Sequence, residues 1–145
     1  MKPRPTRALA AVTAAVLSLL LAACAGVPLS VATNTYPSVP PGYAKTVNLI
    51  SAEPIAVWVH GDTILGVITV SSELCPPVPT AISASDATTI ALTFVKSPNS
   101  PCSSSIAPTT HEFKIPEGID VTAEVTVNIH FAFEGGQDYA VVVRG

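Results

Sequence analysis

Apolar and polar residues alternate along most of the chain after Thr46. The clearest stretch runs from Val121 to Phe131, where every second residue from Val121 onward is apolar and the residues between are polar or charged. A period of two predicts a β-strand with one face on a core and the other in water. Shorter stretches of the same pattern predict strands at Thr88 to Val95 and at Glu112 to Ile115.

Turn residues divide the remaining apolar runs into hairpins. Ile55 to Val59 and Thr63 to Val70 flank a short segment that contains glycine, which is a hairpin signal. Tyr139 to Val143 follows the Gly135-Gly136 turn and is expected to pair with the Val121 strand. Pro79 to Ser85 is the weakest of the predicted strands.

About seven short strands with no amphipathic helix among them predict an all-β domain. The expected fold is a single antiparallel β-sandwich of immunoglobulin-like architecture, and a small barrel is the alternative. Trp58 precedes both Cys75 and Cys102, whereas immunoglobulin domains place the tryptophan between the two cysteines. The likeness is therefore one of architecture. Trp58 is expected in the core, with an exposed binding aromatic as the alternative.

The first 23 residues have the pattern of a signal peptide. Lys2, Arg4 and Arg7 precede an apolar run from residue 8 to residue 23. This run is shorter than the roughly 20 residues that a membrane-spanning helix needs, so an exported chain is favoured over a spanning one.

The run ends in Leu21-Ala22-Ala23-Cys24, which resembles the lipobox of bacterial lipoproteins. The resemblance implies cleavage between Ala23 and Cys24 and acylation of the Cys24 thiol, which would hold the protein at the extracytoplasmic face of the cell membrane. Ordinary secretion is the alternative, because Ala23-Cys24-Ala25 also fits a small-residue cleavage site.

The cysteine count agrees with this interpretation. Three cysteines leave one unpaired, and acylation of Cys24 leaves Cys75 and Cys102 as a single pair in an oxidising compartment. A disulfide there would stabilise the fold by about 3.6 kcal/mol through closure of the intervening loop. The alternative, a reactive or metal-binding pair, lacks a second cysteine or histidine at ligand spacing.

A second resemblance covers Ser71 to Phe113. Ser71-Ser72-Glu73-Leu74-Cys75-Pro76, then Cys102, then Pro108-Thr109-Thr110-His111-Glu112-Phe113 are similar to a group of small actinobacterial lipoproteins. The resemblance implies a disulfide-tied envelope domain and assigns no site.

Residues 24 to 45 are rich in proline and small polar residues, without apolar periodicity. They predict a flexible, lipid-anchored tether that reaches at most some 60 Å, followed by a sandwich domain over residues 46 to 145. Tyr36 and Tyr43 within this segment are expected to pack loosely on the domain rather than to bind a ligand.

The charge of the chain argues against one class of partner. After residue 23 the chain has four basic residues, Lys45, Lys96, Lys114 and Arg144, against ten acids, a net charge of 4 − 10 = −6. This balance argues against nucleic acid as a partner.

No Gly-x-Ser-x-Gly motif marks a nucleophile, and Ser103-Ser104-Ser105 is expected to be a solvated loop. His60, His111 and His130 lack chelating spacing, and Glu134 with Asp138 forms at most a weak calcium turn. We therefore expect no catalytic residue, no metal and no cofactor.

The sequence thus predicts a membrane-anchored, monomeric lipoprotein whose non-enzymatic sandwich is a binding or assembly module of the cell envelope, with an unknown envelope protein or ligand as its partner. An envelope ligand or metal-ion binding protein and a hydrolase with an unrecognised site are the alternatives.

Overall fold

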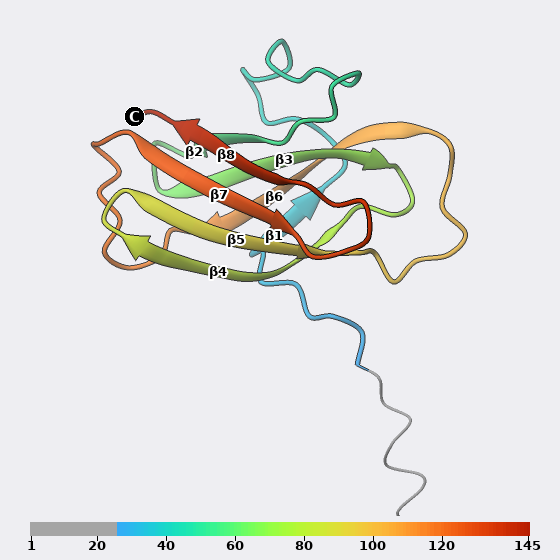
Figure 1. Ribbon diagram of the computed structural model, residues 1–145. Coiled ribbons are helices and arrows are strands. Elements are labelled where there is room, and N and C mark those ends of the chain that lie inside the picture. Colours follow the sequence, from blue (N-terminus) through green and yellow to red (C-terminus); the bar gives the residue numbers. More distant parts are fainter. Residues whose placement is uncertain (1–25) are drawn as a thin grey trace, which may run out of the picture.

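The computed structural model describes residues 26–145, and this part is an all-β sandwich of two four-stranded sheets without a helix (Figure 1). The predicted fold class is confirmed. The signal peptide and the lipobox at Leu21–Cys24 lie outside the described residues. The strands are β1 (Asn34–Tyr36), β2 (Ile55–Val59), β3 (Ile64–Ser72), β4 (Val78–Asp86), β5 (Thr89–Val95), β6 (Ile106–Lys114), β7 (Val125–Phe131) and β8 (Asp138–Val143).

The first sheet has the order β1-β6-β3-β2 and is antiparallel throughout. The predicted hairpin between β2 and β3 is present, with Val59 opposite Ile64. His60, Gly61 and Asp62 in its turn have φ values of 53°, 65° and 61°, the left-handed region that favours glycine. From this turn the His60 side chain reaches Glu112 on β6, with Nε2 lying 3.7 Å from Oε1.

The second sheet has the order β4-β5-β7-β8. The predicted pairing of the Val121 strand with the Tyr139 strand is confirmed as β7 against β8. Strands β5 and β7 run parallel, which the sequence did not indicate. Because β6 lies in the opposite sheet, the chain crosses the sandwich twice before it pairs with β5 again, and this crossover allows the parallel direction.

Two strands begin several residues away from the position that the sequence pattern predicts, and the ends of most others differ by one or two residues. Strand β7 begins at Val125 rather than at Val121, because Asp120 accepts hydrogen bonds from the backbone N–H and the hydroxyl of Thr122 at 3.0 and 2.6 Å and holds a turn there. Strand β6 begins at Ile106, well before Glu112, and runs through Pro108. The proline concealed this strand, since it usually indicates a break.

The core lies between the two sheets. Trp58 is 5% exposed and belongs to this core, in agreement with the expectation for its side chain. The largest fully buried apolar side chains of this core are Phe94, Phe113, Leu65, Ile90, Leu92 and Ile129. Burial of such side chains supplies most of the stabilisation of a domain of this size.

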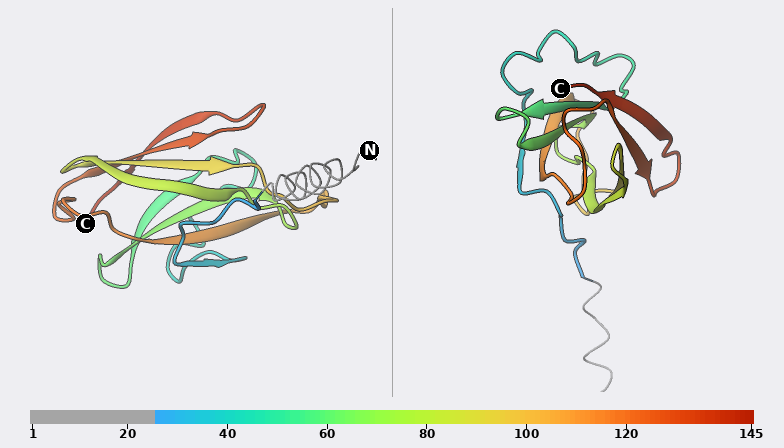
Figure 2. Two further views of the ribbon diagram at one scale, coloured as in Figure 1. Left: turned by 90° about the horizontal axis from the view of Figure 1, so that it is seen from below. Right: turned by 90° about the vertical axis from the view of Figure 1, so that its left-hand side faces the viewer.

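The segment before β2 differs from the flexible tether that its composition predicted. The backbone N–H of Val31 donates to the carbonyl of Pro79 at 2.9 Å, and β1 pairs with β6. Beyond β1, Val39, Tyr43 and Val47 pack against the outer face of β2 and β3. Figure 2 (right) shows this segment as an arch outside those strands. It is part of the domain because the outer face is apolar and needs a cover, and prolines suit a cover that makes few backbone hydrogen bonds.

Candidate functional site

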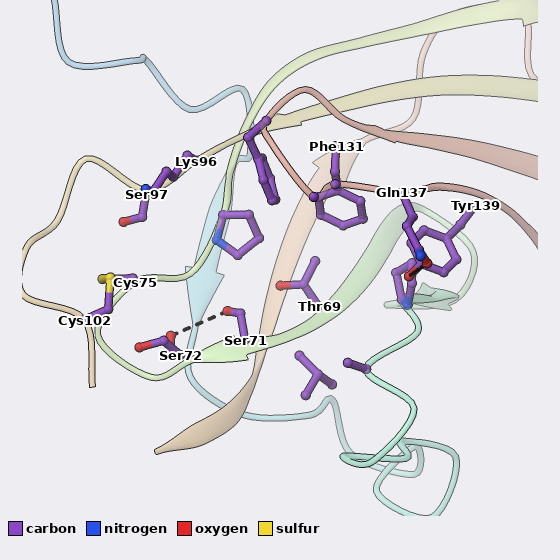
Figure 3. A pocket seen from close by; sticks show the side chains of 17 residues that line it. Thr69, Ser71, Ser72, Cys75, Lys96, Ser97, Cys102, Phe131, Gln137 and Tyr139 are labelled. Atoms are coloured by element: carbon purple, nitrogen blue, oxygen red, sulfur yellow. Dashed lines mark hydrogen bonds between the residues drawn. A yellow bond between two sulfur atoms is a disulfide. The ribbon is translucent and has the colours of Figure 1, made fainter. Parts of the chain in front are cut away.

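A cleft of about 360 Å³ opens between the two sheets at the end of the sandwich that carries the disulfide (Figure 3). One wall is the last part of β3, Thr69 to Ser72, and the other consists of aromatic side chains from β7, β8 and the turn between them. Pro77 and the Cys75–Cys102 bond lie at one side of it. We call this opening the β3 cleft.

The β3 cleft exists because β2 is shorter than β3. Strand β2 pairs with β3 only as far as Ile55 opposite Ile68, whereas β3 continues to Ser72 against β6. Pro54 precedes β2 and has no N–H to extend the ladder. Within residues 26–145, the edge of β3 from Thr69 to Ser72 therefore has no strand on its second side.

All four residues of this edge line the cleft. Because successive side chains of a strand point to opposite faces, four consecutive residues can share one opening only if it runs along the backbone edge. The cleft thus exposes backbone hydrogen-bonding groups as well as side chains.

The opposite wall is an aromatic cluster. The ring centroid of Phe131 lies 5.7 Å from that of Phe133, 6.0 Å from that of Tyr139 and 5.3 Å from that of the buried Phe94. These spacings are typical of favourable aromatic pairs. In the turn below, a Cβ at Gly136 would collide with the carbonyl oxygen of Phe131, so this position requires glycine. Figure 3 shows Phe131 and Tyr139 across the opening from Thr69 and Ser71.

The disulfide predicted from the cysteine count is present between Cys75 and Cys102. It joins the β3–β4 turn to the β5–β6 loop. Hydrogen bonds reinforce this junction, from the Asn99 side-chain amide to the Leu74 carbonyl at 2.7 Å and from the Ser72 hydroxyl to the Ser103 carbonyl at 2.8 Å. Both loops are thereby fixed beside the cleft.

The side chains that line the β3 cleft are mostly apolar or uncharged polar. Among the residues that the structure describes, Lys96 is the one charged residue that lines the cleft, and no histidine or carboxylate does. The hydroxyls of Ser71, Ser72 and Ser97 therefore have no histidine or carboxylate base among the described lining residues. The arrangement suits binding of an apolar group more than nucleophilic catalysis.

One lining hydroxyl does contact a histidine. The Thr69 hydroxyl lies 3.2 Å from Nε2 of His111, whose Nδ1 lies 3.4 Å from the hydroxyl of Thr35. Burial lowers the pKa of His111 to about 4, so its imidazole is neutral at pH 7. A catalytic triad would place a carboxylate where Thr35 stands, and this chain of groups is instead a satisfied polar contact in the core.

The three histidines do not converge. His60 lies at the β2–β3 turn, His111 in the core, and His130 on the outside of the second sheet, where its Nδ1 is 2.6 Å from the Asp138 carboxylate. In the part of the chain that the structure describes, no three His, Cys, Asp or Glu side chains are grouped to hold a metal ion. Glu134 and Asp138, the residues of the possible calcium turn, therefore belong to no such group.

Sequence patterns identified the strands around the cleft but not the cleft itself. The opening depends on where β2 stops relative to β3. Pro54 and the Gly135-Gly136 turn were the available signals, and neither alone distinguishes a ligand cleft from an ordinary loop.

Comparison with known proteins gives no further assignment. No protein-family model, no curated protein and no solved structure matches the chain significantly. Between residues 26 and 145, no helix is long and apolar enough to cross a membrane.

Proposed function

We propose that the protein is an extracytoplasmic lipoprotein anchored through Cys24, and that its sandwich is a non-enzymatic binding module. Its ligand is an extended segment of another envelope polypeptide, which adds to the free edge of β3 and inserts an apolar side chain into the β3 cleft. The observation that supports this most directly is the coincidence of an unpaired strand edge with an apolar opening along Thr69 to Ser72.

Strand addition uses both features of the cleft. Backbone groups of a free edge bind an extended segment of any sequence, and a pocket beside the edge selects its side chains. The cleft volume of about 360 Å³ lies within the range of small ligand sites, which is ample for a leucine or phenylalanine side chain.

The fold restricts how far an anchored domain can reach. Since Val31 is already hydrogen-bonded to the domain, six residues lie between it and Cys24. Six extended residues span about 20 Å. A lipid-anchored domain would therefore stay close to the membrane surface and meet partners there.

Replacement of the acylation site tests the anchor. In the variant Cys24→Ser, the protein is expected to leave the membrane fraction and to appear in soluble fractions, because serine has no thiol to accept the lipid. Fractionation and immunoblotting measure the distribution. The variant Cys75→Ser/Cys102→Ser keeps Cys24 and should remain membrane-bound; retention of the Cys24→Ser protein in the membrane would refute the anchor.

Occupancy of the β3 cleft is tested with the variant Ser71→Cys. We expect a membrane-impermeant maleimide to modify the introduced thiol rapidly in dilute purified protein and several-fold more slowly on intact cells, because a partner strand covers it there. Ser83→Cys on the exposed outer part of β4 serves as the matched control and should react equally fast in both. The proposal would be contradicted if the ratio of the labelling rate on intact cells to the rate in purified protein were the same for the Ser71→Cys and Ser83→Cys variants.

A photo-cross-linker attached to the introduced thiol of the Ser71→Cys variant identifies what covers the cleft. The adduct should contain one polypeptide segment, and a synthetic peptide of that segment should shift NMR signals of β3 cleft residues. An adduct with lipid, or protection without any adduct, would show that the occupant is not a polypeptide.

A further inference from the structure

A second cavity lies on the outer face of the first sheet, under the segment between β1 and β2. Its volume is about 270 Å³. None of the described residues lines both this cavity and the β3 cleft. Two tyrosines, two prolines, a histidine and a carboxylate surround it: Tyr36, Tyr43, Pro40, Pro41, His60 and Glu112.

The carboxylate in this cavity is buried. Glu112 is 8% exposed, although acidic side chains are rarely buried to this degree unless they are paired. Its Oε1 accepts a hydrogen bond from the Tyr36 hydroxyl at 3.0 Å, and its Oε2 accepts one from the Asn34 side-chain amide at 3.2 Å. Both donors are neutral, so they solvate the carboxylate without neutralising its charge.

Glu112 has no permanently charged counter-ion in the described part of the chain. Across residues 26–145, no lysine or arginine nitrogen lies within 4 Å of its oxygens. Nε2 of His60 lies 3.7 Å from Oε1, but the His60 side chain is 68% exposed and carries a charge only when protonated. Lys114, two residues further along β6, is exposed to solvent. A buried charge without a counter-ion is costly, and a bound cation would remove this cost.

The tyrosines hold the walls of the cavity in place. The Tyr43 hydroxyl donates to the carbonyl of Trp58 at 2.9 Å, and the Tyr36 hydroxyl is held by Glu112. Burial, together with the hydrogen bond to Glu112 and its negative charge, raises the pKa of Tyr36, so this hydroxyl remains a donor. Because both hydroxyls are anchored, the rings need little reordering when a ligand enters.

We propose that this cavity binds an organic ammonium group, with Glu112 as its counter-ion and the Tyr36 and Tyr43 rings as its aromatic walls. A cation beside aromatic rings gains cation–π attraction, which is the basis of the aromatic cages that recognise ammonium ligands. The group belongs to a free amine or to a lysine side chain of a partner, and the two sources share this chemistry. The net charge of −6 after residue 23 would attract either one.

Titration of the mature protein with butylammonium tests the charge requirement. We expect saturable NMR shifts of Tyr36 and Tyr43 signals, together with a rise in melting temperature, because the ligand binds only the folded state. Butanol, which has a similar size and no charge, should give neither effect. If butanol binds as well as butylammonium, or if butylammonium does not bind at millimolar concentration, the proposal is wrong.

The variant Glu112→Gln separates charge from shape, because glutamine fills the same space and still accepts a hydrogen bond from Tyr36. We expect the affinity for butylammonium to fall at least tenfold. The exposed Glu117→Gln has the same change in net charge and should bind as the wild type does. Equal affinity of the Glu112→Gln protein and the wild type would overturn the role of Glu112.

A third variant covers the case in which Glu112→Gln does not fold. Tyr43→Leu removes an aromatic wall and leaves the carboxylate in place, and it should weaken butylammonium binding several-fold. Binding by this variant at the wild-type affinity would refute the aromatic site. Comparison of butylammonium with Nα-acetyl-lysine amide, whose Nε is free and charged, separates the two sources. Tighter binding of the lysine derivative identifies a partner's lysine, and equal or weaker binding identifies a free amine.

Discussion

The double variant Cys75→Ala/Cys102→Ala is expected to lower the free energy of unfolding by about 3.6 kcal/mol. The bond closes a loop between residues separated by 27 positions, and its removal returns the conformational entropy of that loop to the unfolded chain. For a domain of about 120 residues this loss corresponds to a fall in melting temperature of roughly 10–20 °C.

Urea unfolding followed by Trp58 fluorescence measures this loss, since Trp58 is 5% exposed in the folded domain. The variant Cys24→Ser is the control, because it removes a thiol outside the disulfide and should leave the midpoint unchanged. A loss below about 1 kcal/mol for the double variant would mean that the hydrogen bonds around Asn99 and Ser72 already hold the junction without the bond.

The strands could be predicted from the sequence wherever one face is buried. In β5, Ile90, Leu92 and Phe94 are at most 1% exposed and alternate with partly exposed residues, and the predicted range was wrong by one residue. The pattern works here because burial of alternate side chains is the main term that fixes the register of such a strand.

The segment before β2 could not be predicted in the same way. Strand β1 is three residues long, and its side chains are polar, so no periodicity indicates it. It forms because β6 offers it an edge, with Asn34 opposite Glu112 and Tyr36 opposite Thr110. Tertiary pairing of this kind overrides local composition, which here predicted a flexible tether.

The two cavities depend on relations between distant parts of the chain. The cavity beside Glu112 is lined by residues from β1, from the segment after it, from the β2–β3 turn and from β6. Only the pairing register of the strands places these residues side by side. The sequence marks Tyr36 and Tyr43 as aromatic residues in a polar segment. It does not mark Glu112, because nothing in the neighbouring residues shows that this side chain is buried.

The second large effect expected is a loss of stability in mild acid that originates at His111. This side chain is 1% exposed, its ring packs edge-on against Phe94 at 5.1 Å, and its two nitrogens face the hydroxyls of Thr69 and Thr35. Burial lowers its pKa from 6.5 to about 4. Between these two values the unfolded chain binds a proton that the folded domain does not, so stability falls as the pH decreases through this window.

The full shift of the His111 pKa corresponds to a loss of about 3 kcal/mol in the free energy of unfolding between pH 6.5 and pH 4. Urea midpoints measured across this range should show the loss in the wild type and in His130→Gln, whose histidine is exposed. The variant His111→Gln should be less stable at pH 7 but should lose about 3 kcal/mol less on acidification. Hydrogen bonds lower the pKa of Asp86 and Asp120 below 3.8, so these groups act only at lower pH. Equal pH dependence of His111→Gln and the wild type would show that the buried imidazole is not the group responsible.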